Sequence, residues 1–160
     1  MWGLSHTPQQ RRIEVVTEVF GGIRDGITWQ PYIQPGRDAV DVHWLYTAQD
    51  TGPDGAEAYI ARFRPGAHGD LHEHLGYELM VVLDGELIND NGDQYLPGTI
   101  VVERPHSIHR VTSPGGCELL VVREKRTVPL PPGATPDDGL ALTAVRKPVA
   151  LDPVAPQATA

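Results

Sequence analysis

The stretch GAHGDLHEHLGYELMVVLDG, residues 66–85, decides the fold expected for this chain. Its histidines His72 and His74 stand two positions apart, and residues two apart on a β-strand point to the same face of a sheet. Glu78 follows a short segment that contains Gly76, and it opens the apolar run 79–83, which is typical of the next strand. Two imidazoles and one carboxylate converging from adjacent strands predict a metal site.

The donor atoms of this site narrow the choice of metal. Nitrogen and hard oxygen donors suit Fe(II), Mn, Ni, Zn or Co, and they do not suit a metal that prefers soft thiolates. The alternative is a pair of surface histidines on a polar loop. This spacing arises by chance in about 2 of 10,000 chains of this composition, when the two histidines and the glutamate are counted together with the flanking Gly66 and Gly85. The low probability favours the metal site.

Length and composition indicate one domain. The chain has 160 residues, 40% of them hydrophobic, with 17 glycines and 15 prolines between short apolar runs. A single domain over residues 1–160 can bury a core of its own, and frequent turns favour an all-β fold. The net charge of -8 argues against a nucleic-acid partner, which would require a basic face.

The cysteine count and the N-terminus bear on the compartment. Cys117 is the one cysteine, so an intrachain disulfide is excluded, and its apolar neighbours indicate a buried strand position. Residues 1–6 lack the pattern of a signal peptide, and no apolar run approaches the length of a membrane span. We therefore expect a soluble cytoplasmic protein.

Short strands separated by turns are expected along the chain. Asp84-Gly85 predicts a hairpin, and Asn91-Gly92-Asp93 predicts a second tight turn. Eight to ten strands at this rhythm imply a β-sandwich or small barrel of the jelly-roll type, preceded by an N-terminal strand and followed by a Pro-rich tail in which 140–145 could add an outer strand. The main expected strands are 13–20 (with a short helix as the alternative), 38–47, 57–64, 78–83, 86–90, 99–103 and 117–124.

A metal held by His72, His74 and Glu78 requires a further donor or a water. His109 is the best candidate, because it follows a Pro-Gly turn and a strand that can return it to the same face of a barrel. Other side chains could line a pocket beside the metal, with ordinary core packing as the stronger default for the apolar and aromatic ones and a solvated loop or turn position as the alternative for the histidines. These candidates are Tyr59, Phe63, His68, Met80, Val82 and His106.

Residues 66–85 resemble the first motif of the cupin superfamily, G-x5-H-x-H-x3/4-E-x6-G, at every fixed position. Residues 97–109 resemble its second motif more loosely, since Pro105 stands one place nearer to the histidine and His106 occupies the position of a glycine. The chain is similar to small single-domain cupins such as the C-terminal lobe of ChrR-type anti-sigma factors and the acetylacetone and dihydroxyacetophenone dioxygenases. This resemblance implies a jelly-roll barrel over about 27–124, a C-terminal extension over 125–160, a metal centre of three histidines and one glutamate, and frequently a homodimer.

The expected function is that of an enzyme with one divalent metal ion per chain, foremost Fe(II) or Zn, with Mn, Ni or Co as further possibilities. The favoured reaction is an oxygen-dependent cleavage of a small carbonyl or enol compound, in which Glu78 acts as a base. Two alternatives stay open. One is a non-oxidative isomerase, lyase or rearrangement enzyme of a biosynthetic pathway, and the other is a zinc-binding sensor module without turnover.

Overall fold

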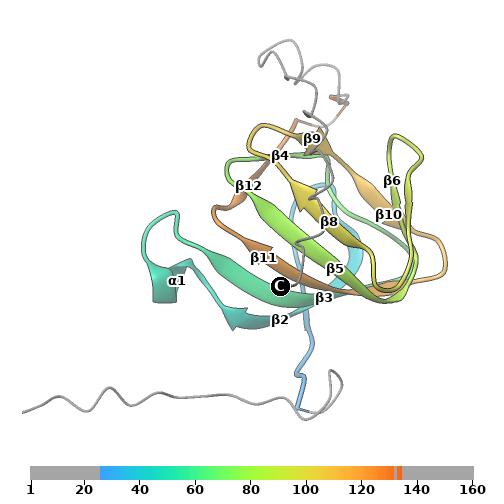
Figure 1. The fold of residues 1–160 in the computed structure, drawn as a ribbon, viewed down its shortest axis with the longest axis horizontal. Coiled ribbons are helices and arrows are strands. Elements are labelled where there is room, and N and C mark those ends of the chain that lie inside the picture. The colour runs from blue at the N-terminus through green and yellow to red at the C-terminus, as the bar shows by residue number, and fades with distance from the viewer. Residues whose placement is uncertain (1–25, 132, 135–160) are drawn as a thin grey trace, which may run out of the picture.

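The computed structural model describes residues 26–131, 133 and 134. The regular structure in this part of the chain is β-strand, apart from a single short helix (Figure 1). The elements are β1 (Gln30–Pro31), β2 (Asp38–Tyr46), α1 (Ala48–Thr51), β3 (Glu57–His68), β4 (His72–His74), β5 (Glu78–Gly85), β6 (Leu87–Asn89), β7 (Gln94–Tyr95), β8 (Ile100–Glu103), β9 (Ile108–His109), β10 (Val111–Ser113), β11 (Cys117–Arg123) and β12 (Thr127–Pro129).

The strands form two antiparallel sheets. The larger has nine strands, with the order β7-β6-β10-β3-β11-β5-β8 and with β2 and β1 attached beside β3. The smaller has the order β12-β4-β9 and lies across one end of the large, curled sheet (Figure 1). This arrangement confirms the all-β jelly-roll expectation. No helix in the described ranges is long and apolar enough to cross a membrane.

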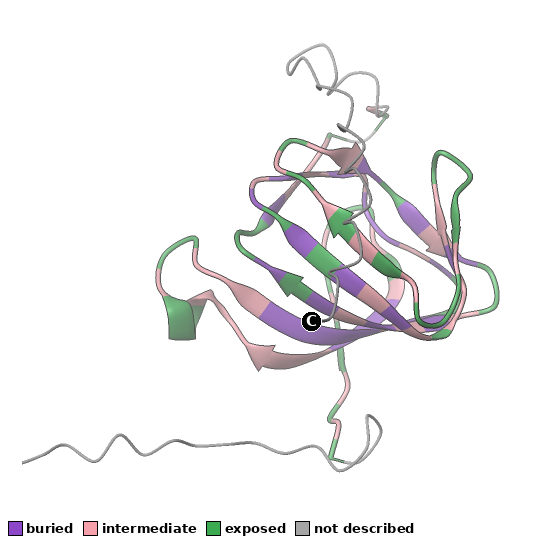
Figure 2. Ribbon diagram, in the orientation of Figure 1, coloured by how far each residue is buried: buried purple, intermediate pink, exposed green. Residues whose placement is uncertain are grey.

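The core lies inside the curl of the large sheet, and β3 runs through its middle between β2 and β11 (Figure 2). Tyr59, Ala61 and Phe63 are buried on one face of β3, as their alternation predicted. Ile60, on the opposite face, is buried as well, so this strand is covered on both sides at its centre. Cys117 is also buried, and burial raises the pKa of its thiol to about 11, so the thiol stays protonated.

The predicted hairpin at Asp84-Gly85 is wrong. β5 pairs with β11 and β8, whereas β6 pairs with β7 and β10. Gly85 has a φ of +76°, and a Cβ atom there would lie 2.1 Å from the carbonyl oxygen of Gly116. A glycine is therefore required at the end of β5, because the backbone there approaches the backbone of Gly116 closely. The second predicted turn, around Gly92, does close the β6–β7 hairpin.

Among the elements that were not predicted are the helix and the last strand. The helix α1 occupies the start of the expected turn region, and Thr47 and Asp50 form a capping box at its first turn. The strand β12 lies in the segment expected to be a C-terminal extension, and it pairs Thr127 with His74 of β4. The predicted strand 13–20 and the possible strand 140–145 lie outside the described residues.

Candidate metal centre and adjoining cavity

Three histidines converge where β4 meets β9. The two histidines of β4 share one face because they stand two positions apart, and the antiparallel register places His72 opposite His109. The Nε2 atom of His74 lies 3.1 Å from Nε2 of His72 and 3.0 Å from Nε2 of His109. Within the described part of the chain, these three side chains form the one group of His, Cys, Asp or Glu residues close enough to hold a metal ion.

Acceptors on the far side of two rings orient the cluster. The Nδ1 atom of His72 donates to the backbone carbonyl of Asp70 at 2.8 Å. Nδ1 of His109 donates to Oδ1 of Asn89 at 3.2 Å, and a carboxylate oxygen of Glu103 lies 3.5 Å from the same nitrogen. A proton held on Nδ1 leaves the Nε2 lone pair free to face the centre of the cluster, which is the arrangement that a metal-binding histidine requires.

Burial keeps the imidazoles neutral. It lowers the pKa of His72 to about 4 and, together with the neighbouring rings, lowers the pKa of His74 to about 2. Burial also lowers the pKa of His109. Three neutral rings whose lone pairs face one another at about 3 Å repel each other unless a cation lies among them. The donor set therefore fits a divalent metal ion.

The fourth predicted ligand, Glu78, lies beside this group but is not part of it. It begins β5, is buried, and places Oε2 3.9 Å from Nδ1 of His74. Burial raises the pKa of Glu78 to about 7, against the opposing effect of the Arg123 guanidinium. Coordination of the metal by Glu78 stays a prediction.

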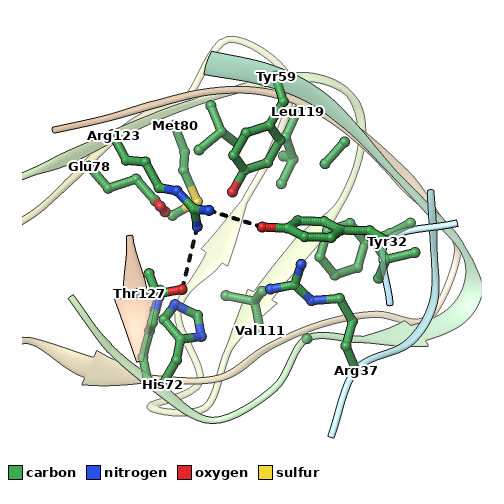
Figure 3. Close-up of a pocket in the computed structure, with 16 residues that line it drawn as sticks. Tyr32, Arg37, Tyr59, His72, Glu78, Met80, Val111, Leu119, Arg123 and Thr127 are labelled. Carbon is green, nitrogen blue, oxygen red and sulfur yellow. Dashed lines mark hydrogen bonds between the residues drawn. The ribbon is translucent and has the colours of Figure 1, made fainter. Parts of the chain in front are cut away.

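A cavity adjoins the histidines inside the curl of the sheet (Figure 3). The cavity has a volume of about 40 Å³, which is room for a few water molecules. Polar side chains gather in it, and Arg123 donates to the hydroxyls of Tyr32 and Thr127 at 3.1 and 3.4 Å. Its lining is Tyr32, Arg37, Val40, Tyr59, Ala61, Phe63, Gly69, His72, Glu78, Met80, His109, Val111, Leu119, Val121, Arg123 and Thr127.

Three of the six predicted pocket residues, Tyr59, Phe63 and Met80, line this cavity, and three do not. Val82 is buried in the core further along β5. His68, at the end of β3, has its Nδ1 atom 3.2 Å from the carbonyl of Gly69. His106 is exposed in a turn with a φ of +72°, and it pairs with Glu73 at 2.8 Å.

The cavity also contains residues that the sequence analysis did not select. Arg123 could have been found, because it continues the inward-facing alternation of Cys117, Leu119 and Val121 on β11, where a charged side chain is unexpected. Arg37 offers no such signal, since it precedes β2 in a turn.

A curled, antiparallel β-structure with three convergent imidazoles that could hold a metal ion, beside an internal cavity, is typical of the cupin class. A profile of the ChrR cupin-like domain matches residues 23–127, and the chain belongs to that family. A comparison with curated protein sequences finds no match.

Solved structures of several cupins share this fold. The polyketide cyclase RemF from Streptomyces resistomycificus has 18% identity and a TM-score of 0.58, with 70% of this chain and 83% of that chain covered. An acetylacetone dioxygenase from Acinetobacter johnsonii has 13% identity and a TM-score of 0.62, with 74% and 82% covered. ChrR of Rhodobacter sphaeroides, in complex with SigE, has 23% identity and a TM-score of 0.50, with 61% of this chain and 49% of that chain covered. These likenesses establish the fold and leave the activity open.

Proposed function

We propose that this protein is an enzyme that uses one divalent metal ion, Fe(II) or Zn foremost, to act on a small organic molecule. The observation that carries the proposal is the cavity beside the cluster, because His72 and His109 line it together with buried polar groups. A metal site with a purely structural role is usually closed by its protein ligands, whereas a catalytic site keeps space for a further ligand.

An ion bound by the three imidazoles would supply Lewis-acid polarisation of a substrate oxygen and, in the case of iron, redox chemistry with O2. The chain itself supplies the binding and the orientation. Val111, Leu119 and Val121 line the cavity with apolar surface that limits the entry of water. Tyr59 is buried, and burial raises the pKa of its phenol, so it is a hydroxyl donor for a substrate oxygen.

Glu78 is the residue proposed to move a proton. It lines the cavity, and in Figure 3 it lies near Met80 and Arg123. A buried carboxylate in this position could accept a proton on an Oε atom from a carbon next to a substrate carbonyl. The same carboxylate is the predicted fourth metal ligand. An Oε atom that is bound to the metal cannot accept the proton at the same time, so Glu78 would have to leave the metal before it acts as a base.

The favoured reaction is an oxygen-dependent cleavage of a small carbonyl or enol compound. In such a reaction O2 is the oxidant, one carbon–carbon bond breaks, and the two oxygen atoms enter the two fragments. The likeness to the fold of an acetylacetone dioxygenase supports this choice. A non-oxidative rearrangement or cyclisation is the second candidate, and the likeness to the polyketide cyclase RemF supports it.

The third candidate is a sensor module that binds zinc without turnover. The family match supports it, because the ChrR cupin-like domain takes its name from an anti-sigma factor, and ChrR has been solved in complex with SigE. The polar lining of the cavity favours an enzyme over this candidate, since a sensor that only holds zinc has no need of buried arginine and tyrosine groups beside it.

One experiment separates the three candidates. The purified chain is loaded with Fe(II) under nitrogen or with Zn(II), and is then incubated with a panel of β-diketones and hydroxyketones. Uptake of O2 together with fragment formation supports the dioxygenase, and product formation under nitrogen supports the non-oxidative enzyme. Tight zinc binding without any turnover supports the sensor. His74→Ala should abolish activity, whereas His106→Ala, which changes an exposed histidine, should retain it.

We further propose that the protein is a homodimer joined through the outer face of β5, β8 and β11. Leu79, Val102 and Val122 are exposed neighbours in one row across these strands, and Ile100 on the edge strand β8 adds to the patch (Figure 2). An exposed apolar patch on an edge strand favours association. Light scattering should show a dimer that Val102→Lys converts to a monomer and that Ile33→Lys, at an exposed position outside the patch, leaves unchanged.

A further inference from the structure

Arg37 presents a buried guanidinium to the cavity with one nitrogen unused. Its Nε and Nη2 atoms donate to Oδ1 of Asp70 at 3.1 and 2.7 Å, and its guanidinium lies 3.7 Å from the ring centre of Tyr32. The side chain is only 7% exposed. The remaining nitrogen, Nη1, is buried and has no hydrogen-bond partner among the described residues. A buried N–H donor without an acceptor is rare, and it indicates a place for a partner that binds there.

The second arginine of the cavity differs in this respect. Arg123 donates through Nε and Nη2 to Glu57, and its other bonds reach the hydroxyls of Tyr32 and Thr127. Each of its three nitrogens therefore has a partner in the protein. The free donor of the cavity belongs to Arg37, which Figure 3 shows reaching from the opposite wall beneath Tyr32.

The charges around the cavity favour an anion. Asp70 pairs with Arg37, and Glu57 pairs with Arg123, so each arginine has one carboxylate partner. Three neutral imidazoles would leave the double positive charge of a bound metal ion to the neighbouring carboxylates, which are those of Glu78, 3.9 Å from His74, and Glu103, 3.5 Å from His109. A ligand that brings a negatively charged oxygen would meet both the ion and the free guanidinium nitrogen.

We propose that Nη1 of Arg37 binds an anionic oxygen of the substrate, which is a small organic acid or enolate that reaches from the metal centre to this arginine. The inference rests on the proposed function, since it names the class of molecule that the same cavity takes. Asp70 is the positioning residue, because its side chain fixes the guanidinium while its backbone carbonyl holds His72. Asp70 thus holds both the guanidinium of Arg37 and the ring of His72, a predicted metal ligand.

Two small probes that differ in charge test this inference. Malonate carries two carboxylates, and malonamide is its uncharged diamide of nearly the same size. Their binding to the zinc-loaded and the metal-free full-length chain is measured by calorimetry for the wild type, Arg37→Gln and Arg37→Lys. Arg64→Gln is the control, because Arg64 also pairs with an aspartate, at 3.0 Å, but is exposed and lies outside the cavity.

In the metal-free chain, where no zinc ion can bind a carboxylate, the wild type should bind malonate at least about 10-fold more tightly than malonamide, which is the discrimination that one charge-assisted contact supplies. Arg37→Gln should remove that preference while zinc still binds at the wild-type stoichiometry, Arg37→Lys should keep part of it, and Arg64→Gln should keep all of it. Equal binding of the two probes by the wild type, or a malonate preference that survives in Arg37→Gln, would overturn the inference and would indicate that only water meets Nη1.

Failure of the proposed function would look different. A wild-type chain that binds no metal refutes the metal-dependent enzyme, and the malonate preference of the metal-free chain then tests Arg37 by itself. A chain that binds metal and turns over substrate, but shows no difference between the probes, refutes the anion site alone. If Arg37→Gln unfolds, a folded Arg37→Lys variant should still keep part of the malonate preference, because lysine retains the positive charge, and equal probe binding by the wild type still overturns the inference.

Discussion

Replacing Arg123 by methionine should strongly destabilise the protein, because it breaks a buried ion pair between β11 and β3 of the large sheet. The side chains of Arg123 and Glu57 are only 7% and 13% exposed, and Nε of the arginine donates to Oε2 of the glutamate at 2.7 Å. The substitution leaves the Glu57 carboxylate buried without its partner and also removes the bonds to Tyr32 and Thr127.

Loss of one member of a buried pair costs about 3–5 kcal/mol of unfolding free energy. The assay is urea unfolding of the metal-free chain, followed by circular dichroism. Arg126→Met is the matched control, because Arg126 pairs with Asp54 at 3.2 Å with both side chains largely exposed, and such a pair contributes about 0–1 kcal/mol.

A double variant tests the cause of the destabilisation. When Glu57 is also changed to methionine, no buried charge is left unpaired, and the double variant should be more stable than Arg123→Met alone. If Arg123→Met costs no more than Arg126→Met, or if the second change adds to the loss, the pair does not stabilise the fold in the way described.

Three further results are expected. The metal-free chain should lose stability as the pH falls from about 6.5 towards 4, because the folded-state pKa values of His72 (about 4) and His74 (about 2) lie below that of an unfolded histidine, so that the unfolded chain binds more protons in this range. Glu78, whose pKa is raised to about 7, opposes this trend. Urea unfolding at several pH values with a chelator present measures the sum of these effects, and a stability that does not change with pH in Glu78→Gln would contradict the expectation. Gly85→Ala should lower the free energy of unfolding by more than about 2 kcal/mol, since the new Cβ would collide with the backbone of Gly116. Gly92→Ala, at a position that also has a positive φ but open space around it, should lower it by only about 1 kcal/mol. Equal losses of unfolding free energy would contradict the role given to the close approach of the two backbones. Asn89→Ala, which removes the acceptor for Nδ1 of His109, should weaken zinc binding roughly 10-fold to 100-fold in a competition titration, and unchanged affinity would show that Asn89 does not orient the ring.

Two of the three clustered histidines could be predicted from local geometry, whereas His109, 35 residues from His74, was predicted from the turn and the strand that precede it. The spacing of His72 and His74 fixes a common face on any β-strand, and the strand leading to His109 returns to the same sheet. The same reasoning failed at Asp84-Gly85, where a dipeptide typical of hairpins makes a close contact with Gly116, which directly precedes the distant strand β11. A turn motif carries no information about such a contact.

The cavity could not be predicted in full because its polar groups meet only through the fold. Arg37 is 33 residues from Asp70, and Arg123 is 66 residues from Glu57. No pattern within either segment indicates the pairing. Only the inward alternation of β11 offered a sign, in that it places a charged residue on a strand face that is otherwise apolar.

The most direct test of the account is the metal content of the purified chain after loading with zinc and removal of the excess. Mass spectrometry of the metal should give one ion per wild-type chain and per His106→Ala chain, and close to none for His74→Ala, whose circular dichroism should still be that of a folded β protein. A His74→Ala variant that is folded and retains the full amount of zinc would contradict the assignment of these imidazoles as metal ligands.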